Sequence, residues 1–278
     1  MQLYQLPHVF EATVVARPSK QIKSPYLADV CVTDATDAGG AMCHTPSLGC
    51  SGMIAAGARV IVGENANAKC KSKYTLYHVI VPTPDGVGRV VGTHPMIAQA
   101  IAGNYLRQAY AAAAGWTWKA ECKLPATDNC RWDYVAYDAT GALAMVVECK
   151  AVPLGDTEDF ETSVRKKRGY AQDMDCTSKV ALFPDGFRKK ATDPVSPRAL
   201  KHVQALQRLA EAGVQCMLLF VCQRNDCDRF TISKNDPLYR DAVIDAMRAG
   251  VVVRCIAVDW IDCGREARLI GELPVVAL

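Results

Sequence analysis

An apolar run at positions 143–152, with the sequence LAMVVECKAV, constrains the fold of this chain more than any other segment. A run of this length between turn residues predicts a strand that is buried on both faces of a sheet. Alternate side chains of a strand share a face, so Glu148 and Lys150 point one way and Cys149 the other. Burying a charge is costly unless it is paired or binds a metal. The pair therefore either reaches solvent at the strand end or belongs to a functional site.

A second carboxylate is expected beside the first. The segment 130–137, with the sequence CRWDYVAY, is also predicted to be a strand, and residues 138–141 have the composition of a turn. In an antiparallel hairpin the start of one strand lies next to the end of the other. Asp133 would then lie across from Glu148.

Two carboxylates and a lysine that converge in this way suit a Mg²⁺ or Mn²⁺ site, because these cations prefer oxygen ligands. We expect Asp133 and Glu148 to bind the metal, with the main-chain carbonyl of Cys149 as a further ligand. Lys150 would position or deprotonate the attacking water, or stabilise the transition state at phosphorus. The D…ExK spacing is the signature of the PD-(D/E)XK nuclease superfamily, although the pattern alone is weak.

Composition narrows the class of protein. The chain has 278 residues and a net charge of only +3, so nucleic-acid binding would have to come from local basic patches. No apolar run is long enough for a transmembrane helix, and the N-terminus lacks the pattern of a signal peptide. Thirteen scattered cysteines without a Cys-x-x-Cys pair predict reduced thiols in an intracellular, cytoplasmic protein and no structural zinc site.

The chain divides into two expected domains within a mixed α+β architecture. Residues 1–85 show about five short strands with turns between them, which predicts an OB-like barrel. Residues 86–278 alternate helices and strands, which predicts an α/β domain of the PD-(D/E)XK, restriction-endonuclease-like type, with a sheet separate from the barrel. Helices are expected at 95–114, at 196–212 and from 236 to 250, and strands at 118–123, 215–223 and 251–258. The segment 155–179 is expected to be a loop or partly helical.

Basic and polar residues outside the hairpin are candidates for nucleic-acid contacts. Cations beside tyrosines in the loops of a small barrel fit a single-strand groove, and a solvated loop face is the alternative. On the helix that starts near 197, a basic solvated face formed by Arg198, Lys201 and His202 is again the alternative. At the end of the strand 215–223, a polar pair either faces the active site or forms a structural salt bridge. The candidates are Arg17, Lys23, Lys69, Lys71 and Lys73 in the barrel, Arg198 and Lys201 on the helix, and Gln223 and Arg224 after the strand.

With these motifs in place, the chain resembles the sugar fermentation stimulation protein (SfsA) family along nearly its whole length. The matching segments are YLADV at 26–30, HTPSLG at 44–49, GARV at 57–60, RWDY at 131–134, VECKAV at 147–152, LFPD at 182–185, FVCQRND at 220–226, DPLY at 236–239 and LPVV at 273–276. The resemblance implies an OB-like domain on a PD-(D/E)XK core, non-specific DNA binding and a regulatory role in sugar metabolism. It also adds Glu121, which matches a glutamate of the family, to the catalytic candidates.

One departure from the family bears on the site. A carboxylate that is often found in the first long helix falls at Gly103 or Asn104 here, so a metal ligand from that helix is not expected.

The sequence thus predicts a nucleic-acid-binding protein with a divalent-metal-dependent nuclease site that hydrolyses phosphodiesters. Its partner would be DNA, possibly RNA, bound largely without sequence preference and away from membranes. The alternative is a non-catalytic, non-specific DNA-binding regulator on a nuclease fold. A metabolic or protein-interaction role without nucleic acid is the weakest of the three.

Overall fold

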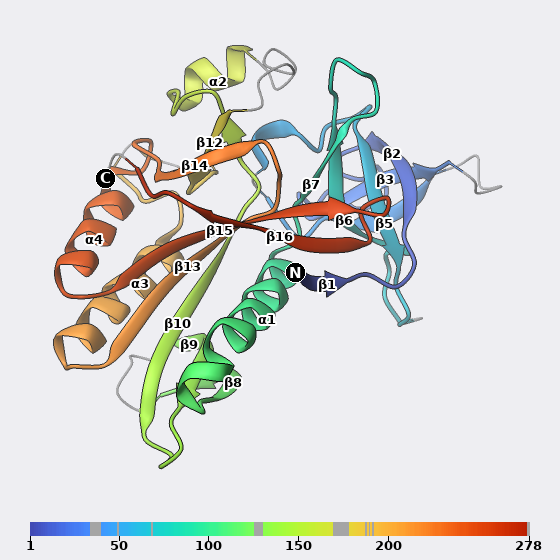
Figure 1. Ribbon diagram of the computed structural model, residues 1–278. Coiled ribbons are helices and arrows are strands. Elements are labelled where there is room, and N and C mark those ends of the chain that lie inside the picture. Colours follow the sequence, from blue (N-terminus) through green and yellow to red (C-terminus); the bar gives the residue numbers. More distant parts are fainter. Residues whose placement is uncertain are drawn as a thin grey trace.

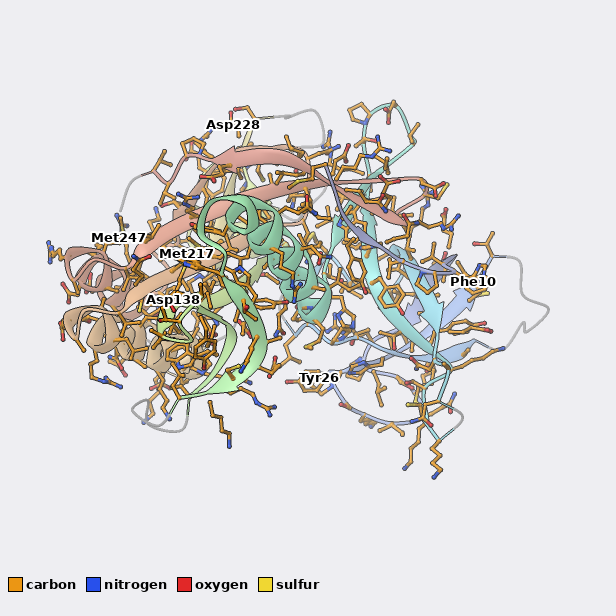
Figure 2. All side chains as sticks on the ribbon, turned by 60° about the horizontal axis from the view of Figure 1, so that its bottom comes forward. Phe10, Tyr26, Asp138, Met217, Asp228 and Met247 are labelled. Atoms are coloured by element: carbon orange, nitrogen blue, oxygen red, sulfur yellow. The ribbon has the colours of Figure 1, made fainter. Side chains whose placement is uncertain are left out.

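The computed structural model describes residues 1–33, 40–48, 50–67, 69–124, 130–168, 178–186, 188, 190 and 192–276. These residues form a mixed α and β structure in which a small β-barrel packs against a larger sheet with helices on both faces (Figure 1). Met217 lies inside the larger unit, whereas Phe10 lies on the barrel (Figure 2). No helix among the described residues is long and apolar enough to cross a membrane.

The barrel is built from short strands that alternate buried and exposed side chains, as in Ala12 and Val14 of the first barrel strand. Its strands are β2 (Phe10–Ala16), β3 (Leu27–Val32), β4 (Ala41–His44), β5 (Arg59–Glu64), β6 (Tyr74–Val81) and β7 (Arg89–Gly92). The hydrogen-bonded order is β4-β3-β2-β5-β6-β7, and parallel pairing of β4 with β6 closes the barrel over five strands. A single-turn 3₁₀ helix, η1 (Cys50–Gly52), follows β4. The small barrel expected from the sequence is confirmed, and its OB type stays a prediction.

The larger sheet contains the predicted buried strand at its centre. In spatial order its strands are β1 (Gln2–Gln5), β16 (Glu266–Leu273), β15 (Val252–Ile261), β13 (Gln215–Cys222), β10 (Leu143–Val152), β9 (Arg131–Tyr137) and β8 (Thr117–Lys123). β10, β13 and β15 run parallel to one another, and the flanking pairs are antiparallel. Residues 145–149 of β10 are buried because helices cover both faces of the sheet.

Three helices cover this sheet, and each begins at a proline that suits the first helical position. α1 (Pro95–Ala114) ends at Gly115 with a φ of 60°, and it packs on the face that carries Val147 and Cys149. α3 (Pro197–Glu211) is capped by the Ser196 hydroxyl, and α4 (Pro237–Arg248) by the Asp236 carboxylate. Both lie on the opposite face. The three helices predicted from these capping signals are confirmed.

Some strands were not expected. β12 (Lys179–Phe183), β14 (Cys227–Ile232) and the two-residue β11 (Gly155–Asp156) form a separate small sheet, and β16 lies next to the edge of the large one. β14 and β16 carry charged residues between apolar ones, and the apolar run of β12 is short, so none shows the long apolar run that marks β10. The segment 155–179, expected to be a loop or partly helical, contains β11 and α2 (Thr162–Arg168), and residues 169–177 lie outside the described residues.

Two segments lie on the other side of the expected domain boundary at residue 85. β1 pairs with β16, so the first strand of the chain shares the sheet that contains β10, contrary to the expectation of a separate sheet. Leu3 and Leu6 explain this position, because both are buried in the core beneath α1. β7 pairs with β6 and so belongs to the barrel sheet.

Buried polar contacts hold the barrel on the larger sheet; we refer to them as the clasp. The Gly92 amide of β7 donates to the Gln223 carbonyl at 2.8 Å. His78 Nε2 lies 2.9 Å from the Gly264 carbonyl oxygen, and Arg89 Nη1 lies 3.1 Å from Asp226 Oδ2. Opening the two units would leave these buried groups without partners, which is costly.

Candidate functional site

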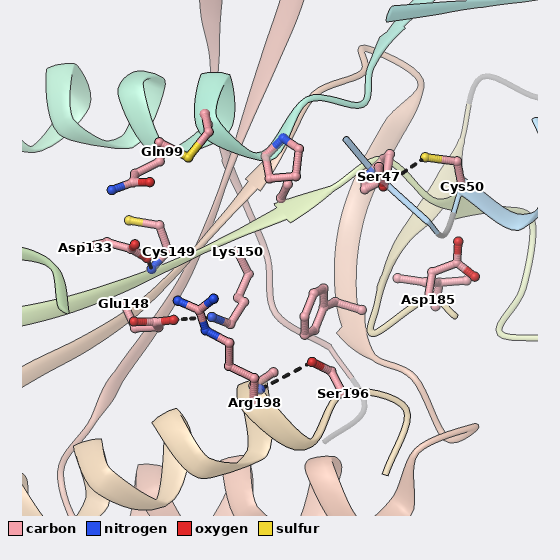
Figure 3. Close-up of a pocket in the computed structure, with 17 residues that line it drawn as sticks. Ser47, Cys50, Gln99, Asp133, Glu148, Cys149, Lys150, Asp185, Ser196 and Arg198 are labelled. Carbon is pink, nitrogen blue, oxygen red and sulfur yellow. Dashed lines mark hydrogen bonds and ion pairs between the residues drawn. The ribbon is translucent and has the colours of Figure 1, made fainter. Parts of the chain in front are cut away.

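A cleft of about 450 Å³ lies where the barrel meets the larger unit (Figure 3). Its floor is the end of β10, and its walls come from the first turns of α1 and α3, from the segment after β12 and from the loop before η1. The lining residues are Ser47, Cys50, Pro95, Met96, Gln99, Asp133, Glu148, Cys149, Lys150, Ala151, Pro153, Leu182, Phe183, Asp185, Ser196, Arg198 and Ala199.

The predicted hairpin brings Asp133 and Glu148 together in this cleft. β9 and β10 are antiparallel with Val147 opposite Tyr134, so Asp133 and Glu148 occupy the next positions. There the ladder ends, and the Cys149 amide donates to Asp133 Oδ2 at 2.7 Å. The carboxylate thus replaces a main-chain acceptor where the strands separate.

Glu148 is 3% exposed, and its two oxygens have different surroundings. Oε1 accepts hydrogen bonds from Lys150 Nζ and, at 2.5 Å, from His202 Nδ1. Oε2 is buried and has no hydrogen-bond partner among the described residues. Burial would raise the pKa of Glu148, but the Lys150 ammonium and the His202 hydrogen bond outweigh it and hold the pKa below its ordinary value.

Asp133 responds in the opposite direction. Burial and the nearby Glu148 carboxylate raise its pKa to about 6, although Lys150 and the Cys149 amide oppose the shift. The cleft floor therefore carries two carboxylates, and the nearby positive charge stabilises the ionised form of Glu148 but not that of Asp133. Perturbed acidic groups in a cleft are typical of functional sites.

Glu121 lies beside this floor without lining the cleft. It is on β8 with a φ of 54°, and its side chain is 41% exposed. Oε1 accepts from Gln99 Nε2 at 2.6 Å, and Oε2 lies 3.5 Å from Arg131 Nη1. Gln99, which the sequence did not single out, does line the cleft and connects α1 to Glu121.

The structure explains why α1 has no carboxylate at the family position. A Cβ atom at Gly103 would overlap the ring and hydroxyl of Tyr134, which donates to the Gln99 carbonyl at 2.9 Å. Asn104 donates to the Leu3 carbonyl at 2.7 Å and so fastens β1 to the helix. Both positions hold α1 against its neighbours, and of the described α1 residues that line the cleft, Pro95, Met96 and Gln99, Gln99 is the polar one.

His202 is the functional candidate that sequence reasoning misplaced. The alternative of a basic solvated face for Arg198, Lys201 and His202 is wrong for His202, which is buried against Glu148. The signal was present, because position 202 falls in the stripe of Ala199, Val203 and Leu206 that faces the core. Arg198 and Lys201 are exposed, and only Arg198 lines the cleft.

The other nucleic-acid candidates lie away from the cleft. Lys23, Lys69, Lys71 and Lys73 are exposed in barrel loops. Arg17 is half-buried and donates to the Ser47 carbonyl at 2.8 Å and to the Pro25 carbonyl at 3.0 Å. Burial lowers the pKa of Arg17.

Gln223 and Arg224 are both buried, and neither lines the cleft. Arg224 donates to both carboxylate oxygens of Asp226, at 2.5 and 2.7 Å, and to the Pro153 carbonyl. Arg224 therefore forms the structural salt bridge, which was one of its two expected roles. Its guanidinium group is not available to a phosphate at the surface.

Replacing His202 by alanine should destabilise the protein by about 2–4 kcal/mol, because the change leaves a cavity and removes one partner of the buried Glu148 carboxylate. Urea unfolding followed by circular dichroism measures this effect. Gln204→Ala is the control, since Gln204 is exposed on the same helix and should change stability by less than about 0.5 kcal/mol. Equal stabilities of the two variants would contradict the contact between His202 and Glu148.

A cation in this cleft would need ligands in addition to the acidic side chains. Among the described residues no three His, Cys, Asp or Glu side chains form a group placed to hold a metal ion. Asp133 and Glu148 would therefore have to be supplemented by main-chain oxygens and water. Such a ligand set is usual for Mg²⁺, which often takes one or two carboxylates and keeps several waters.

Comparison with known proteins agrees with the resemblance found in the sequence. Residues 172–262 match the family model described as "Sugar fermentation stimulation protein RE domain". A sugar fermentation stimulation protein homolog from Alteromonas mediterranea is 28% identical over 275 residues, which cover 97% of this chain and 98% of the homolog. One from Rhodospirillum centenum is 29% identical over 270 residues, covering 93% of this chain and 95% of the homolog.

The fold is also shared with a solved structure, that of Pyrococcus furiosus SfsA in complex with Ca²⁺. The TM-score is 0.73 at 18% sequence identity, and the match covers 100% of both chains. The family model, the curated homologs of nearly equal length and the common fold all point the same way: the chain is similar to proteins of the SfsA family along nearly its whole length.

Proposed function

We propose that this protein is a divalent-metal-dependent phosphodiesterase that acts on nucleic acid. The observation that carries the proposal is the arrangement on the cleft floor, where Asp133 and Glu148 lie at facing positions and Lys150 is bonded to Glu148. This arrangement matches the D…ExK pattern of the PD-(D/E)XK nucleases, and its members come from two neighbouring strands. The relative from Pyrococcus furiosus is described as a complex with Ca²⁺, which supports a divalent-cation site here.

The residues present fit Mg²⁺ or Mn²⁺. Glu148 Oε2 is a buried acceptor without a partner among the described residues, and such an atom is costly unless something binds it. In a strand pair the amide and carbonyl of one residue point to the same side, so the Cys149 carbonyl is directed to the side on which Asp133 receives the Cys149 amide. When bound, the cation would neutralise phosphate charge and acidify a water molecule.

Lys150 has a separate role in this proposal. Its side chain is 14% exposed and lines the cleft, and Glu148 fixes the position of its ammonium group. From there Lys150 would orient or deprotonate the attacking water, or stabilise the negative charge that develops on the phosphate. His202 donates to the same oxygen of Glu148 and keeps the carboxylate in place, which makes His202 a positioning residue.

The barrel lysines would supply affinity that depends little on base sequence. Replacing Lys69, Lys71 and Lys73 together by alanine should weaken DNA binding. It should also reduce the slope of log K against log [salt] by about 2–3, because fewer counterions are released when three phosphate contacts are lost. Fluorescence anisotropy at several salt concentrations measures the slope. The matched control replaces three exposed lysines outside the barrel, Lys119, Lys123 and Lys234. If the two triple variants have the same slope, the binding surface lies elsewhere.

A non-catalytic DNA-binding regulator remains the second candidate, and one observation favours it. α1 presents Gly103 and Asn104 where family members carry a carboxylate, and both are used for packing. A site with fewer acidic ligands binds a cation more weakly. In this case DNA would bind without being cleaved.

Incubating labelled DNA and RNA with the protein in Mg²⁺, in Mn²⁺ and in EDTA separates the two candidates. The proposal requires cleavage of at least one substrate that depends on the metal and disappears with Lys150→Ala. Binding without cleavage under all metal conditions would favour the regulator.

A further inference from the structure

We propose that the cleft accepts one single strand of nucleic acid and excludes a duplex, with Arg198 binding a phosphate and Tyr26 stacking on a base at the rim. This inference rests on the proposed function, because it concerns the substrate of the same site. Four features of the structure support it: the size of the cleft, the clasp that fixes its walls, the position of Arg198 and the exposure of Tyr26.

The cleft is narrow because it has a wall on each side. α3 contributes residues 196–199 on one side, and the barrel contributes Ser47 and Cys50 on the other. Its volume of about 450 Å³ is in the range of pockets that enclose one small ligand, roughly 300–1,000 Å³. A nucleotide or two can enter such a space, whereas a double helix cannot. Enzymes that act on a base in a close-fitting pocket likewise take single strands or bases flipped out of the stack.

The walls are fixed relative to each other. The clasp joins the barrel to the larger sheet through Arg89 and Asp226, through His78 and Gly264, and through the Gly92 amide. Burial would raise the pKa of Asp226, but Arg224 and Lys179 outweigh it and keep the pKa well below its ordinary value, so the carboxylate stays charged as the anchor for Arg89. Widening the cleft would break these buried contacts together.

The barrel wall itself is tied down. Arg17 bridges the carbonyls of Pro25 and Ser47, and the Thr45 amide donates to the Tyr26 carbonyl at 2.8 Å. These bonds hold the loop at residues 25–26 against the loop that lines the cleft.

Arg198 is placed to bind a phosphate inside the cleft. It lies in the first turn of α3, a helix of 15 residues, and it lines the same cleft as Glu148 and Lys150 (Figure 3). The Arg198 side chain forms no hydrogen bond or ion pair with another residue that the structure describes. An arginine of this kind can hold a phosphate with two parallel hydrogen bonds. A strand running along the floor would thus have one phosphate at Lys150 and Arg198.

Tyr26 provides an exposed aromatic surface on the loop that is hydrogen-bonded to the barrel wall of the cleft. Its side chain is 43% exposed, and it lies between the barrel and the larger unit (Figure 2). Bases of a single strand stack on exposed aromatic rings without regard to sequence. In a duplex these faces are already covered by neighbouring bases, so Tyr26 favours the single strand.

Binding is tested in EDTA, where cleavage does not interfere, with a labelled oligonucleotide offered as single-stranded DNA, single-stranded RNA and blunt duplex. Wild type should bind at least one single strand more tightly than the duplex. Tyr26→Ala should weaken single-strand binding roughly 5- to 100-fold, and Tyr26→Phe should retain it, because the ring remains. Arg198→Ala should reduce the slope of log K against log [salt] by about 0.7, the value for one phosphate contact to a single strand.

Arg208→Ala is the matched control, because Arg208 is exposed on the same helix outside the cleft. The substituted side chains are exposed, so folding should be preserved, and circular dichroism checks this. Equal affinity for duplex and single strands, or unchanged single-strand binding by both Tyr26→Ala and Arg198→Ala, would overturn the inference. If single-strand binding follows the expected pattern but neither Mg²⁺ nor Mn²⁺ supports cleavage, the proposed enzymatic function is wrong while the single-strand site is retained.

Discussion

Lys150→Ala is expected to lower the rate of phosphodiester cleavage by about 10²- to 10⁴-fold, the usual effect of losing a group that transfers or positions a proton. Divalent-metal binding should survive the change, because the ammonium group is not a ligand. Glu148 also keeps its contact with His202, so its carboxylate stays in position. Single-turnover cleavage assays with saturating Mg²⁺ measure the rate, and Mn²⁺ titration calorimetry measures the affinity.

Lys234→Ala serves as the control, since Lys234 is exposed and lies outside the cleft. It should cleave like the wild type. A Lys150→Ala variant that cleaves at the wild-type rate would remove Lys150 from the chemistry. A variant that loses metal affinity as well would show that Lys150 supports the ligands rather than the reaction.

Asp133→Asn is expected to abolish metal binding and cleavage together and, at neutral pH, to make the protein more stable by up to about 3 kcal/mol. The asparagine keeps an oxygen that can accept the Cys149 amide, so the strand ends can stay joined. The gain in stability arises because the charged aspartate is unfavourable in the metal-free folded state.

The pH dependence of this gain follows from the pKa shift. Burial and Glu148 raise the pKa of Asp133 from 3.8 to about 6 in the folded protein. At a pH below the unfolded value both states are protonated, and the carboxyl group then costs no stability. As the pH rises from about 4 to 6 only the unfolded state ionises, and stability falls to a constant lower level.

Urea unfolding in EDTA at about pH 4 and about pH 7.5 tests this directly. The stability difference between Asp133→Asn and wild type should be small at the lower pH and should reach its full size at the higher one. The same difference at both pH values would contradict the raised pKa of Asp133.

Local signals were sufficient for the hairpin at the cleft floor and for the helices that cover the large sheet. The apolar run of β10 and the turn after β9 predicted the hairpin and so the meeting of Asp133 with Glu148. Proline at the first helical position predicted where α1, α3 and α4 begin. These features depend on neighbours within a few residues, which the sequence displays directly.

The remaining features depend on contacts between distant segments. β1 pairs with β16, which lies at the other end of the chain, and no local sequence pattern indicates this pairing. The contact between His202 and Glu148 joins positions 54 residues apart. The burial of Arg224 depends on Asp226 and on the Pro153 carbonyl, and only the assembled fold shows that these acceptors occupy the guanidinium group.

Calorimetric titration of wild type and Glu148→Gln with Mn²⁺ tests the central claim most directly, because it asks whether the two carboxylates form a cation site. The account predicts that wild type binds Mn²⁺ at submillimolar concentration, and that Glu148→Gln loses this binding while it keeps its fold. A wild type that binds no Mn²⁺ at millimolar concentration would contradict the account. Equal binding by Glu148→Gln would also contradict it, because the cation would then be held elsewhere.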